Sequence, residues 1–252
     1  MSEPGRPRAP IARGRVSRAE VSEVLRSGTL EVLGLLPNAS NGTFLARAAL
    51  ESEKELAVYK PRRGETPLWD FPDGTLCSRE VAAYVVARTL GWPDVPPTVL
   101  RDGPYGVGSV QTFVRFDPEE HYFTLADRFP DDFRRIALFD LVVNNADRKG
   151  GHCLLGEDGR IHVVDHGVCF SVEPKVRTVI WDFAGDPIPS PLREDLRRLT
   201  KGVRSGPVRT ELQALLDGAE LEALAARADA AARLDRLPSP DTDRRPFPWP
   251  PI

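Results

Sequence analysis

The sequence predicts an α+β fold in which a strand-rich N-terminal lobe precedes a helix-rich C-terminal lobe. Short apolar runs broken by turn residues dominate the first half of the chain, whereas longer helical patterns dominate the second half. The 252 residues, of which 41% are hydrophobic, are enough to build a real core in one large or two small domains. We therefore expect an N-lobe over residues 15–116 and a C-lobe over residues 117–236.

Turn residues and apolar spacing define the elements of the first lobe. Pro61 ends one apolar run, Ser78 can cap a helix, and Gly91 can end that helix. The expected elements are a helical pattern at 16–26, two strands joined by a turn within 30–50, a strand at 55–60, a helix at 79–90, and strands at 96–100 and 109–116.

The second lobe begins with an apolar helical segment that we expect to be largely buried. A turn at 157–159 joins two short apolar runs, which indicates a compact hairpin. The expected elements are a helix at 133–144, hairpin strands at 152–155 and 161–164, and helices at 190–199 and 211–234.

Both ends of the chain have a different composition. Residues 1–14 and 237–252 are rich in proline and charge and poor in periodic apolar residues, so we expect neither to have fixed structure. The run at 246–251 could alternatively dock a partner in the polyproline form.

Charge and hydropathy exclude several classes of function. The net charge of −3 gives no basic field for nucleic acid, so no nucleic-acid partner is expected. No apolar run approaches the length of about 20 residues that spans a bilayer, and the N-terminus lacks the apolar stretch of a signal peptide. We therefore expect no transmembrane segment and a cytoplasmic location. The three cysteines form no CxxC, which favours buried thiols over a disulfide or zinc site.

Two polar segments flank the predicted hairpin. The first, at 144–152, follows the buried helix and contains many polar groups. Burying these groups beside a core costs free energy unless they bind ligands or other polar groups. The second places Asp165 directly after an apolar strand and Gly167 two residues later, as suits a carboxylate that holds Mg²⁺ against a phosphate. The alternatives are a plain surface loop for the first and a simple turn for the second.

Together these segments resemble the core of the phosphatidylinositol 3-/4-kinase-related and HipA-like atypical kinases. In those kinases a DRxxxN-type loop is followed by a hairpin and a D-x-G motif, matched here by Asp147-Arg148 and by Asp165-His166-Gly167. Phe139-Asp140-Leu141 is similar to the helix that enters this loop in the type II lipid kinases. The chain is identified as a member of an actinobacterial family related to these kinases. The resemblance implies a bilobal protein-kinase-like fold that binds ATP with Mg²⁺ or Mn²⁺.

The resemblance also implies roles for residues of the two motifs. Asp147 would orient or deprotonate the acceptor hydroxyl, Arg148 or Lys149 would stabilise the γ-phosphate, and Asp165 would bind the metal. His152 stands where these kinases have asparagine as the second metal ligand. Since imidazole suits Mn²⁺ or Zn²⁺ better than Mg²⁺, either the metal preference shifts, or only one metal site is kept, or catalysis is impaired. A histidine that merely starts a strand is the alternative.

An upstream lysine fits the same resemblance. Arginine outnumbers lysine by 29 to 5, so Lys60 at the end of an apolar strand is noteworthy. In a kinase this lysine would pair the nucleotide's phosphates, with Glu80 of the next helix as its ion-pair partner. The alternative for Lys60 is a solvated lysine at the end of a strand. The alternative for Glu80 is an acid that the helix dipole favours in the first turn.

The resemblance implies two further contacts to the nucleotide. A turn between two strands could close over the phosphates through backbone N–H groups, although a simple hairpin turn is an equal alternative. A segment at the junction of the lobes would present backbone groups to the adenine edge. The residues are Ser40, Asn41 and Gly42 for the turn, and Phe113, Val114 and Arg115 for the junction.

These inferences predict an ATP-dependent phosphotransferase that acts on a hydroxyl of a small molecule, a lipid or a protein. No basic membrane-facing cluster is evident, so specificity for inositol lipids does not follow. A nucleotide-binding pseudokinase that acts through a protein partner is the alternative, and a scaffold without nucleotide is a third. Four aromatics in loops could shape an acceptor pocket or simply pack beneath the loops: Trp69, Phe71, Trp181 and Phe183.

Overall fold

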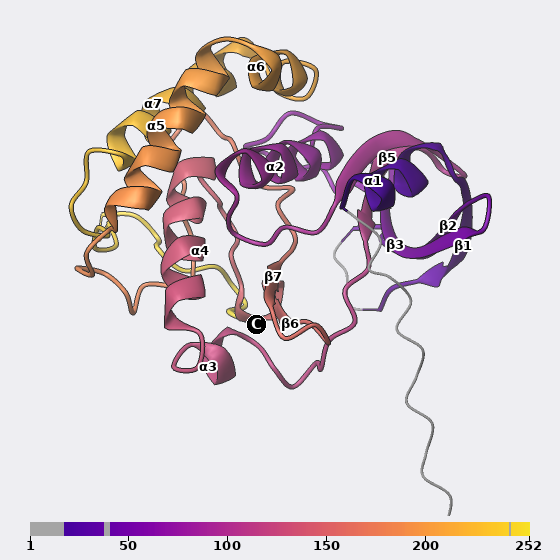
Figure 1. The fold of residues 1–252 in the computed structure, drawn as a ribbon, viewed down its shortest axis with the longest axis horizontal. Coiled ribbons are helices and arrows are strands. Elements are labelled where there is room, and N and C mark those ends of the chain that lie inside the picture. The colour runs from indigo at the N-terminus through magenta and orange to yellow at the C-terminus, as the bar shows by residue number, and fades with distance from the viewer. Residues whose placement is uncertain (1–17, 38–40, 242) are drawn as a thin grey trace, which may run out of the picture.

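A computed structural model describes residues 18–37, 41–241 and 243–252. It contains a five-stranded antiparallel sheet in the order β1-β2-β3-β5-β4, a separate hairpin, and helices, most of which gather on one side of the molecule while α1 lies against the sheet (Figure 1). The α+β class predicted from the sequence is confirmed. The N-terminal segment that we expected to lack structure, residues 1–14, lies outside the described residues, as does Ser40.

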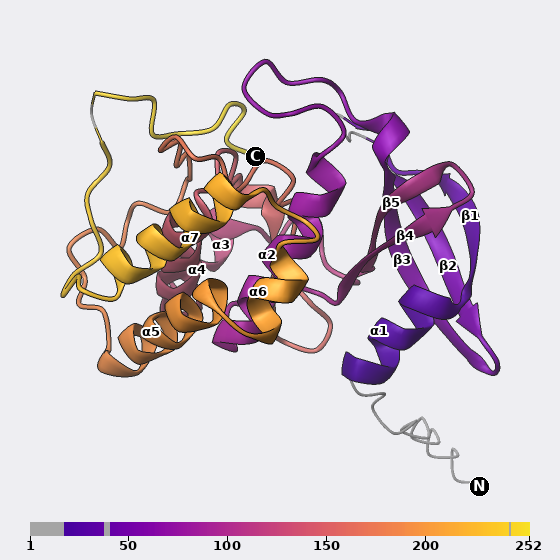
Figure 2. The same cartoon turned by 90° about the horizontal axis from the view of Figure 1, so that it is seen from above.

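One helix covers a face of the sheet (Figure 2). Ala57 and Tyr59 point toward α1 and join its Val24 and Leu25 in a small core. Because side chains alternate along a strand, Lys60 points to the opposite face. The elements are α1 (Arg18–Ser27), β1 (Thr29–Leu35), β2 (Phe44–Leu50), β3 (Glu53–Pro61), β4 (Thr98–Gly103) and β5 (Gly106–Thr112).

The helix after β3, α2 (Leu76–Leu90), begins three residues earlier than the sequence predicts. The carboxylate of Glu65 accepts hydrogen bonds from the N–H groups of Leu76 and Cys77, at 3.1 and 2.8 Å. It thereby satisfies two of the unpaired donors at the helix start, so Ser78 is not the cap. A short 3-10 turn, η1 (Arg62–Gly64), precedes this loop.

The second lobe is built around a larger core that also includes most of α2. One predicted helix, 211–234, is in fact two, because Asp217 starts a new helix: it accepts the N–H of Glu220 at 2.8 Å in a capping box. The elements are α3 (Tyr122–Leu125), α4 (Pro130–Val143), η2 (Gly150–His152), β6 (Cys153–Leu155), β7 (Ile161–Val163), α5 (Ser190–Arg204), α6 (Pro207–Leu212) and α7 (Gly218–Ala231).

The proline-rich tail has a defined place, contrary to the expectation from its composition. The carbonyl of Pro246 accepts the Thr178 N–H at 3.0 Å and the Trp181 Nε1–H at 3.1 Å, and the carbonyl of Pro251 accepts the Gly150 N–H at 2.8 Å. Proline lacks an N–H but keeps its carbonyl, so a proline-rich segment can still accept hydrogen bonds from other segments. The chain thus ends beside the β6–β7 hairpin (Figure 1).

The helices of the described residues are all too short or too polar to cross a membrane.

Candidate active site

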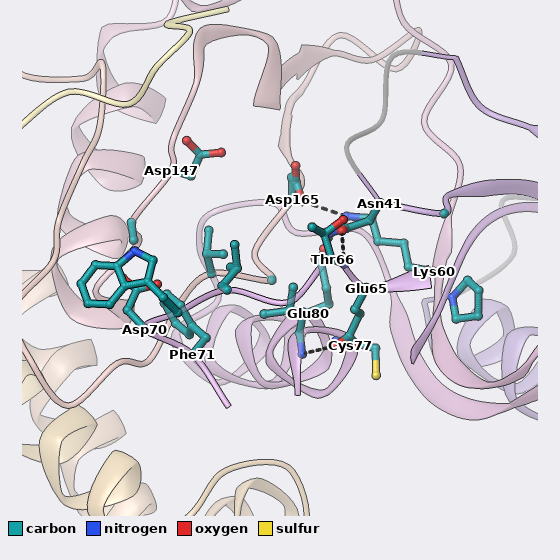
Figure 3. Close-up of a pocket in the computed structure, with 18 of the residues that line it drawn as sticks. Asn41, Lys60, Glu65, Thr66, Asp70, Phe71, Cys77, Glu80, Asp147 and Asp165 are labelled. Carbon is teal, nitrogen blue, oxygen red and sulfur yellow. Dashed lines mark hydrogen bonds and ion pairs between the residues drawn. The ribbon is translucent and has the colours of Figure 1, made fainter. Parts of the chain in front are cut away.

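A cavity of about 390 Å³ lies between the sheet, α2 and the loops that follow α4 and β7. Lys60 reaches it from the sheet, whereas Asp147 and Asp165 reach it from the second lobe (Figure 3). The two segments that the sequence singled out on either side of the hairpin therefore meet at one cavity.

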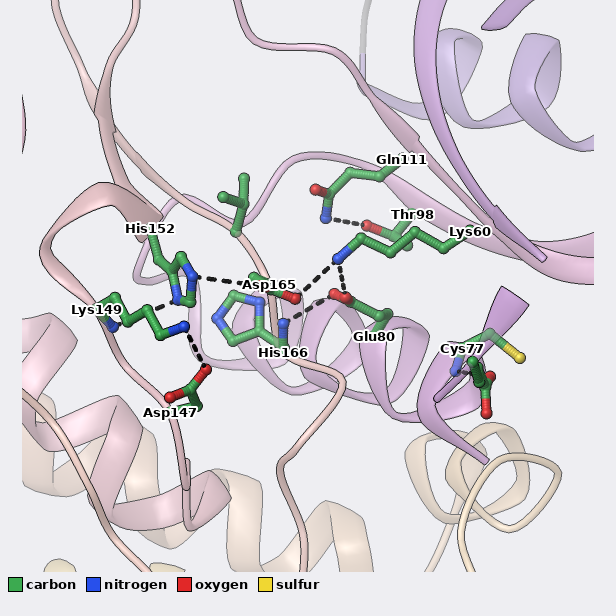
Figure 4. A network of polar contacts seen from close by, with 12 residues as sticks. Lys60, Cys77, Glu80, Thr98, Gln111, Asp147, Lys149, His152, Asp165 and His166 are labelled. Carbon is green, nitrogen blue, oxygen red and sulfur yellow. Dashed lines mark hydrogen bonds and ion pairs between the residues drawn. The ribbon is translucent and has the colours of Figure 1, made fainter. Parts of the chain in front are cut away.

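Lys60 joins three parts of this site (Figure 4). Its Nζ donates to Glu80 Oε1 on α2 and to Asp165 Oδ1 after β7, the latter at 2.9 Å. The other oxygen of Glu80 accepts the N–H of His166 at 2.9 Å. The predicted ion pair between Lys60 and Glu80 is therefore present, and Glu80, which is only 3% exposed, also holds the backbone of the D-x-G segment.

Electrostatics keep Lys60 and Asp165 charged. Burial lowers the pKa of Lys60, but the carboxylates of Asp165 and Glu80 outweigh this effect and raise it. The charge of Lys60 holds the pKa of Asp165 well below its usual range. The backbone of Asp165 has a φ of 61°, a left-handed conformation that is uncommon for residues other than glycine. Such backbone strain often accompanies functional sites.

His152 lies on the far side of Asp165 from Lys60. Its Nε2 is 3.3 Å from Asp165 Oδ2, and its Nδ1 accepts the N–H of Lys149 at 3.4 Å. Burial lowers the pKa of His152 to about 4, so the imidazole is neutral near pH 7. The structure thus brings together the two residues that the sequence assigned to a metal. A neutral imidazole and a carboxylate side by side are both possible ligands.

Asp147 and Lys149 form a second pair at the cavity. Lys149 Nζ is 3.3 Å from Asp147 Oδ2, and the N–H of Asp147 donates to Asn145 Oδ1 at 3.0 Å. Burial raises the pKa of Asp147, while the charge of Lys149 opposes this rise. A carboxylate with a raised pKa is a better acceptor for a hydroxyl proton than an ordinary one.

Arg148 does not reach the cavity, which corrects the proposed contact between this side chain and the γ-phosphate. The side chain is 0% exposed, and Nε and Nη2 donate to the carboxylate of Asp140 on α4 at 2.9–3.2 Å. Its remaining donors go to the Val164 carbonyl at 2.9 Å and to His166 Nε2 at 2.7 Å. Arg148 therefore links α4 to the segment around Asp165 from inside the lobe.

Asn41 and Gly42, the described residues of the predicted phosphate-closing turn, line the cavity, but their polar groups are partly engaged. The N–H of Gly42 donates to the Gly64 carbonyl at 2.9 Å, and the side chain of Asn41 accepts the N–H of Thr66 at 2.8 Å. A Cβ on Gly42 would lie 3.2 Å from the Cα of Gly64, a tight contact that shows how closely the two backbones approach. The Gly42 N–H cannot also bind a phosphate in this arrangement.

Residues 113–115, predicted to face the adenine edge, do not line this cavity. They line another of about 470 Å³, together with Asp158 and His162. The Phe113 N–H donates to Leu56 O at 2.8 Å, and Arg115 O accepts the Glu157 N–H at 3.1 Å. Within the described residues, the backbone of Val114 makes no hydrogen bond. Among the described residues, the Phe113 carbonyl and the Arg115 N–H likewise make no hydrogen bond, so they and the Val114 backbone are available for a ligand.

Two further cavity residues could not be identified from the sequence. Arg177 lines the cavity beside Asp147 but lies in a loop without apolar periodicity, and Glu65 is hidden in the polar loop before α2. Among the loop aromatics, Trp69 and Phe71 line the cavity, the former 94% exposed. Trp181 and Phe183 lie elsewhere in the C-lobe, against its core and tail.

Comparisons with known proteins bear on the family and the fold of the chain. A family model described as "Phosphatidylinositol 3- and 4-kinase" matches residues 98–216. Phosphatidylinositol 4-kinase gamma 4 of Oryza sativa subsp. japonica is 28% identical over 68% of this chain, which spans 38% of the rice protein.

Solved structures share the fold at low identity. The proinflammatory kinase CtkA of Helicobacter pylori superposes with a TM-score of 0.50 at 12% identity, covering 84% of this chain and 94% of that one. The hydra Fam20 structure with sugar gives a TM-score of 0.53 at 14% identity, covering 85% and 87%. The protein-kinase-like fold predicted from the sequence is therefore confirmed.

The chain is thus an atypical kinase-fold protein related to the phosphatidylinositol 3- and 4-kinases. It belongs to the same family as Protein Rv2133c of Mycobacterium tuberculosis, to which it is 40% identical over 92% of this chain and 96% of that protein.

Proposed function

We propose that the protein is an ATP-dependent phosphotransferase that acts on a hydroxyl-bearing acceptor. The observation that carries the proposal is the position of Lys60, whose ammonium bonds both Glu80 of α2 and Asp165 after β7 at the edge of the cavity. A lysine held in this way on the third strand is placed to pair the phosphates of a nucleotide, and the neighbouring carboxylate is placed to hold their metal.

The residues at the cavity fit a nucleotide with one divalent cation. Asp165 supplies one carboxylate beside the imidazole of His152, and Mg²⁺ or Mn²⁺ completes its ligand set with phosphate oxygens and water. When bound, the cation would neutralise charge on the phosphates. Residues 113–115 line the neighbouring cavity, so the adenine edge would reach the Val114 backbone only if the nucleotide extended from the Lys60 cavity toward the junction of the lobes.

Asp147 would act on the acceptor. Its carboxylate faces the cavity, its backbone is held by Asn145, and burial raises its pKa. We assign it the acceptor hydroxyl, which it would orient and whose proton it would take. Lys149, bonded to that carboxylate, would keep it oriented and remain close to the transferred group.

Calorimetry with ATP and either Mg²⁺ or Mn²⁺ tests binding, and labelled γ-phosphate tests transfer, including transfer to the protein itself. We expect Asp147→Asn to bind ATP normally while transfer falls by about 10²–10⁴-fold. Asp165→Ala should lose the metal dependence of binding. Absence of heat with both metals, or binding by Asp165→Ala that keeps its metal dependence, would contradict the proposal.

A second candidate is a nucleotide-binding pseudokinase that acts through a protein partner. The observation that favours it is His152 beside Asp165, at the position where related kinases have asparagine. Binding of ATP without any transfer in the wild type, combined with transfer by His152→Asn, would select this reading over an active kinase.

A further inference from the structure

We propose that Arg177 contacts the γ-phosphoryl group during transfer and stabilises its charge. The inference rests on the proposed phosphotransferase function and deepens it. It fills the role that the sequence assigned to Arg148, whose guanidinium is enclosed in the C-lobe.

The backbone of Arg177 is fixed next to the catalytic loop. Its N–H donates to the Asn145 carbonyl at 2.9 Å, and its carbonyl accepts the N–H of Arg148 at 2.9 Å. The Val179 N–H then donates to the Arg148 carbonyl at 3.1 Å. These bonds bracket Asp147, so Arg177 and the proposed base are held in register although they are 30 positions apart in the sequence.

The guanidinium of Arg177 differs from the other cations at the site. Lys60 is bound by two carboxylates, Lys149 by Asp147, and Lys175 by Asp70 at 2.9 Å. Arg177 is half-buried and lines the same cavity, yet among the described residues its side chain makes no hydrogen bond or ion pair. A cation that lines an acidic cavity without a carboxylate partner is available for a ligand.

The charge of Arg177 nevertheless acts on Asp147. Burial raises the pKa of Asp147, and the charges of Lys149 and Arg177 both oppose that rise. Arg177 is therefore close to the proposed base without being paired to it. The space between the two side chains is where the group transferred from nucleotide to acceptor would lie.

The chemistry of transfer needs a cation at this point. The acceptor oxygen forms a bond to the γ-phosphorus as its proton passes to the Asp147 carboxylate. The bond from that phosphorus to the β–γ bridging oxygen breaks, and ADP leaves with the electron pair. Charge spreads over the three peripheral oxygens in the transition state, and a guanidinium can donate two parallel hydrogen bonds to them.

Titration of the protein with ATP and with ADP, each with Mn²⁺, tests the inference. Because only ATP carries the γ-phosphate, we expect Arg177→Ala to weaken ATP binding by about 10-fold or more, the loss of a charged hydrogen bond, and to leave ADP binding unchanged. Transfer should fall by at least about 10³-fold, as when other arginines that stabilise phosphoryl transfer are lost. Arg177→Lys should recover part of both losses.

Arg204→Ala is the matched control, since Arg204 is an exposed arginine of α5 that does not line the cavity, and it should change nothing. The inference would be overturned if Arg177→Ala weakened the binding of ATP and of ADP equally, or weakened neither. A rise in the KM for the acceptor as the only change would also overturn it. If Arg177→Ala does not fold, Arg177→Gln, which keeps the length of the side chain, gives the same comparison. Failure of the wild type to bind either nucleotide would instead refute the proposed function.

Discussion

His152 Nε2 lies 3.3 Å from Asp165 Oδ2, on the opposite side of that carboxylate from Lys60. The carboxylate at the centre of the site is thus flanked by a cation and by a neutral imidazole. Nitrogen ligands favour Mn²⁺ over Mg²⁺, whereas Mg²⁺ prefers oxygen.

His152→Asn should therefore change the choice of metal. We expect the wild type to bind ATP more tightly with Mn²⁺ than with Mg²⁺, and the amide oxygen of the variant to reduce or reverse that preference. Calorimetric titration of ATP with each metal measures the ratio of the two affinities. His121→Asn is the control, since His121 contacts Thr124 and Phe123 rather than Asp165, and it should leave the ratio unchanged. An unchanged ratio in His152→Asn would show that His152 is not a metal ligand.

Lys60→Met should destabilise the fold because it leaves the buried carboxylate of Glu80 without its cation. Removing one partner of a buried ion pair costs about 3 kcal/mol. The carboxylate of Asp165 is half-exposed and stays solvated, so it adds little to this cost. The double variant Lys60→Met/Glu80→Gln should recover much of this loss in urea unfolding. Lys201→Met, on the surface of α5, is the control. A double variant no more stable than Lys60→Met would show that the unpaired charge is not the cause.

The stability contribution of His162 should disappear as the pH rises. Burial lowers the pKa of His162, but the carboxylates of Asp94 and Asp158, at 3.4 and 3.1 Å, outweigh this effect and raise it. A group with a raised pKa stabilises fully below its unfolded value of about 6.5, and the contribution is lost as the pH rises through the folded pKa.

We therefore expect His162→Gln to lower the free energy of unfolding more at about pH 5.5 than at about pH 9. Urea unfolding of both proteins at the two pH values measures the difference. Equal destabilisation at both pH values would mean that the imidazole acts only through packing.

Trp181→Phe should loosen the tail. The change keeps an aromatic ring but removes the indole N–H that donates to Pro246, a bond worth about 1 kcal/mol. We expect faster hydrogen exchange at the N–H groups of Gly150 and Thr178, whose acceptors are Pro251 and Pro246. Trp69→Phe, at an exposed indole without a hydrogen bond among the described residues, is the control. Unchanged exchange in Trp181→Phe would show that the tail is held elsewhere.

Local patterns were sufficient for much of the fold. The apolar run before Asn144, the hairpin turn and the strand ending at Lys60 all appear in the structure within a few residues of the predicted positions. The pairing of Lys60 with Glu80 followed from the scarcity of lysine together with the family resemblance. Such features depend on residues close in the sequence or on a motif.

What the sequence could not supply were contacts over long separations. The start of α2 depends on Glu65, eleven residues before Leu76, and the tail is held by donors from segments far upstream. The family resemblance assigns Arg148 or Lys149 to the γ-phosphate, yet the side chain of Arg148 points into the C-lobe, toward Asp140. A signal was present: Asp140 is an acid within an otherwise apolar stretch, and such a residue needs a buried cation.

α2 ties the sheet to the C-lobe. Arg79 on α2 bonds Glu220 on α7, both buried, and most of the helix packs into the larger core. The same helix contacts β4 and β5 and carries Glu80, the partner of Lys60 on the sheet. Lys60 is thus bound at once to a helix anchored in the C-lobe and to Asp165 after β7, so a single ammonium group sets the position of β3 relative to both.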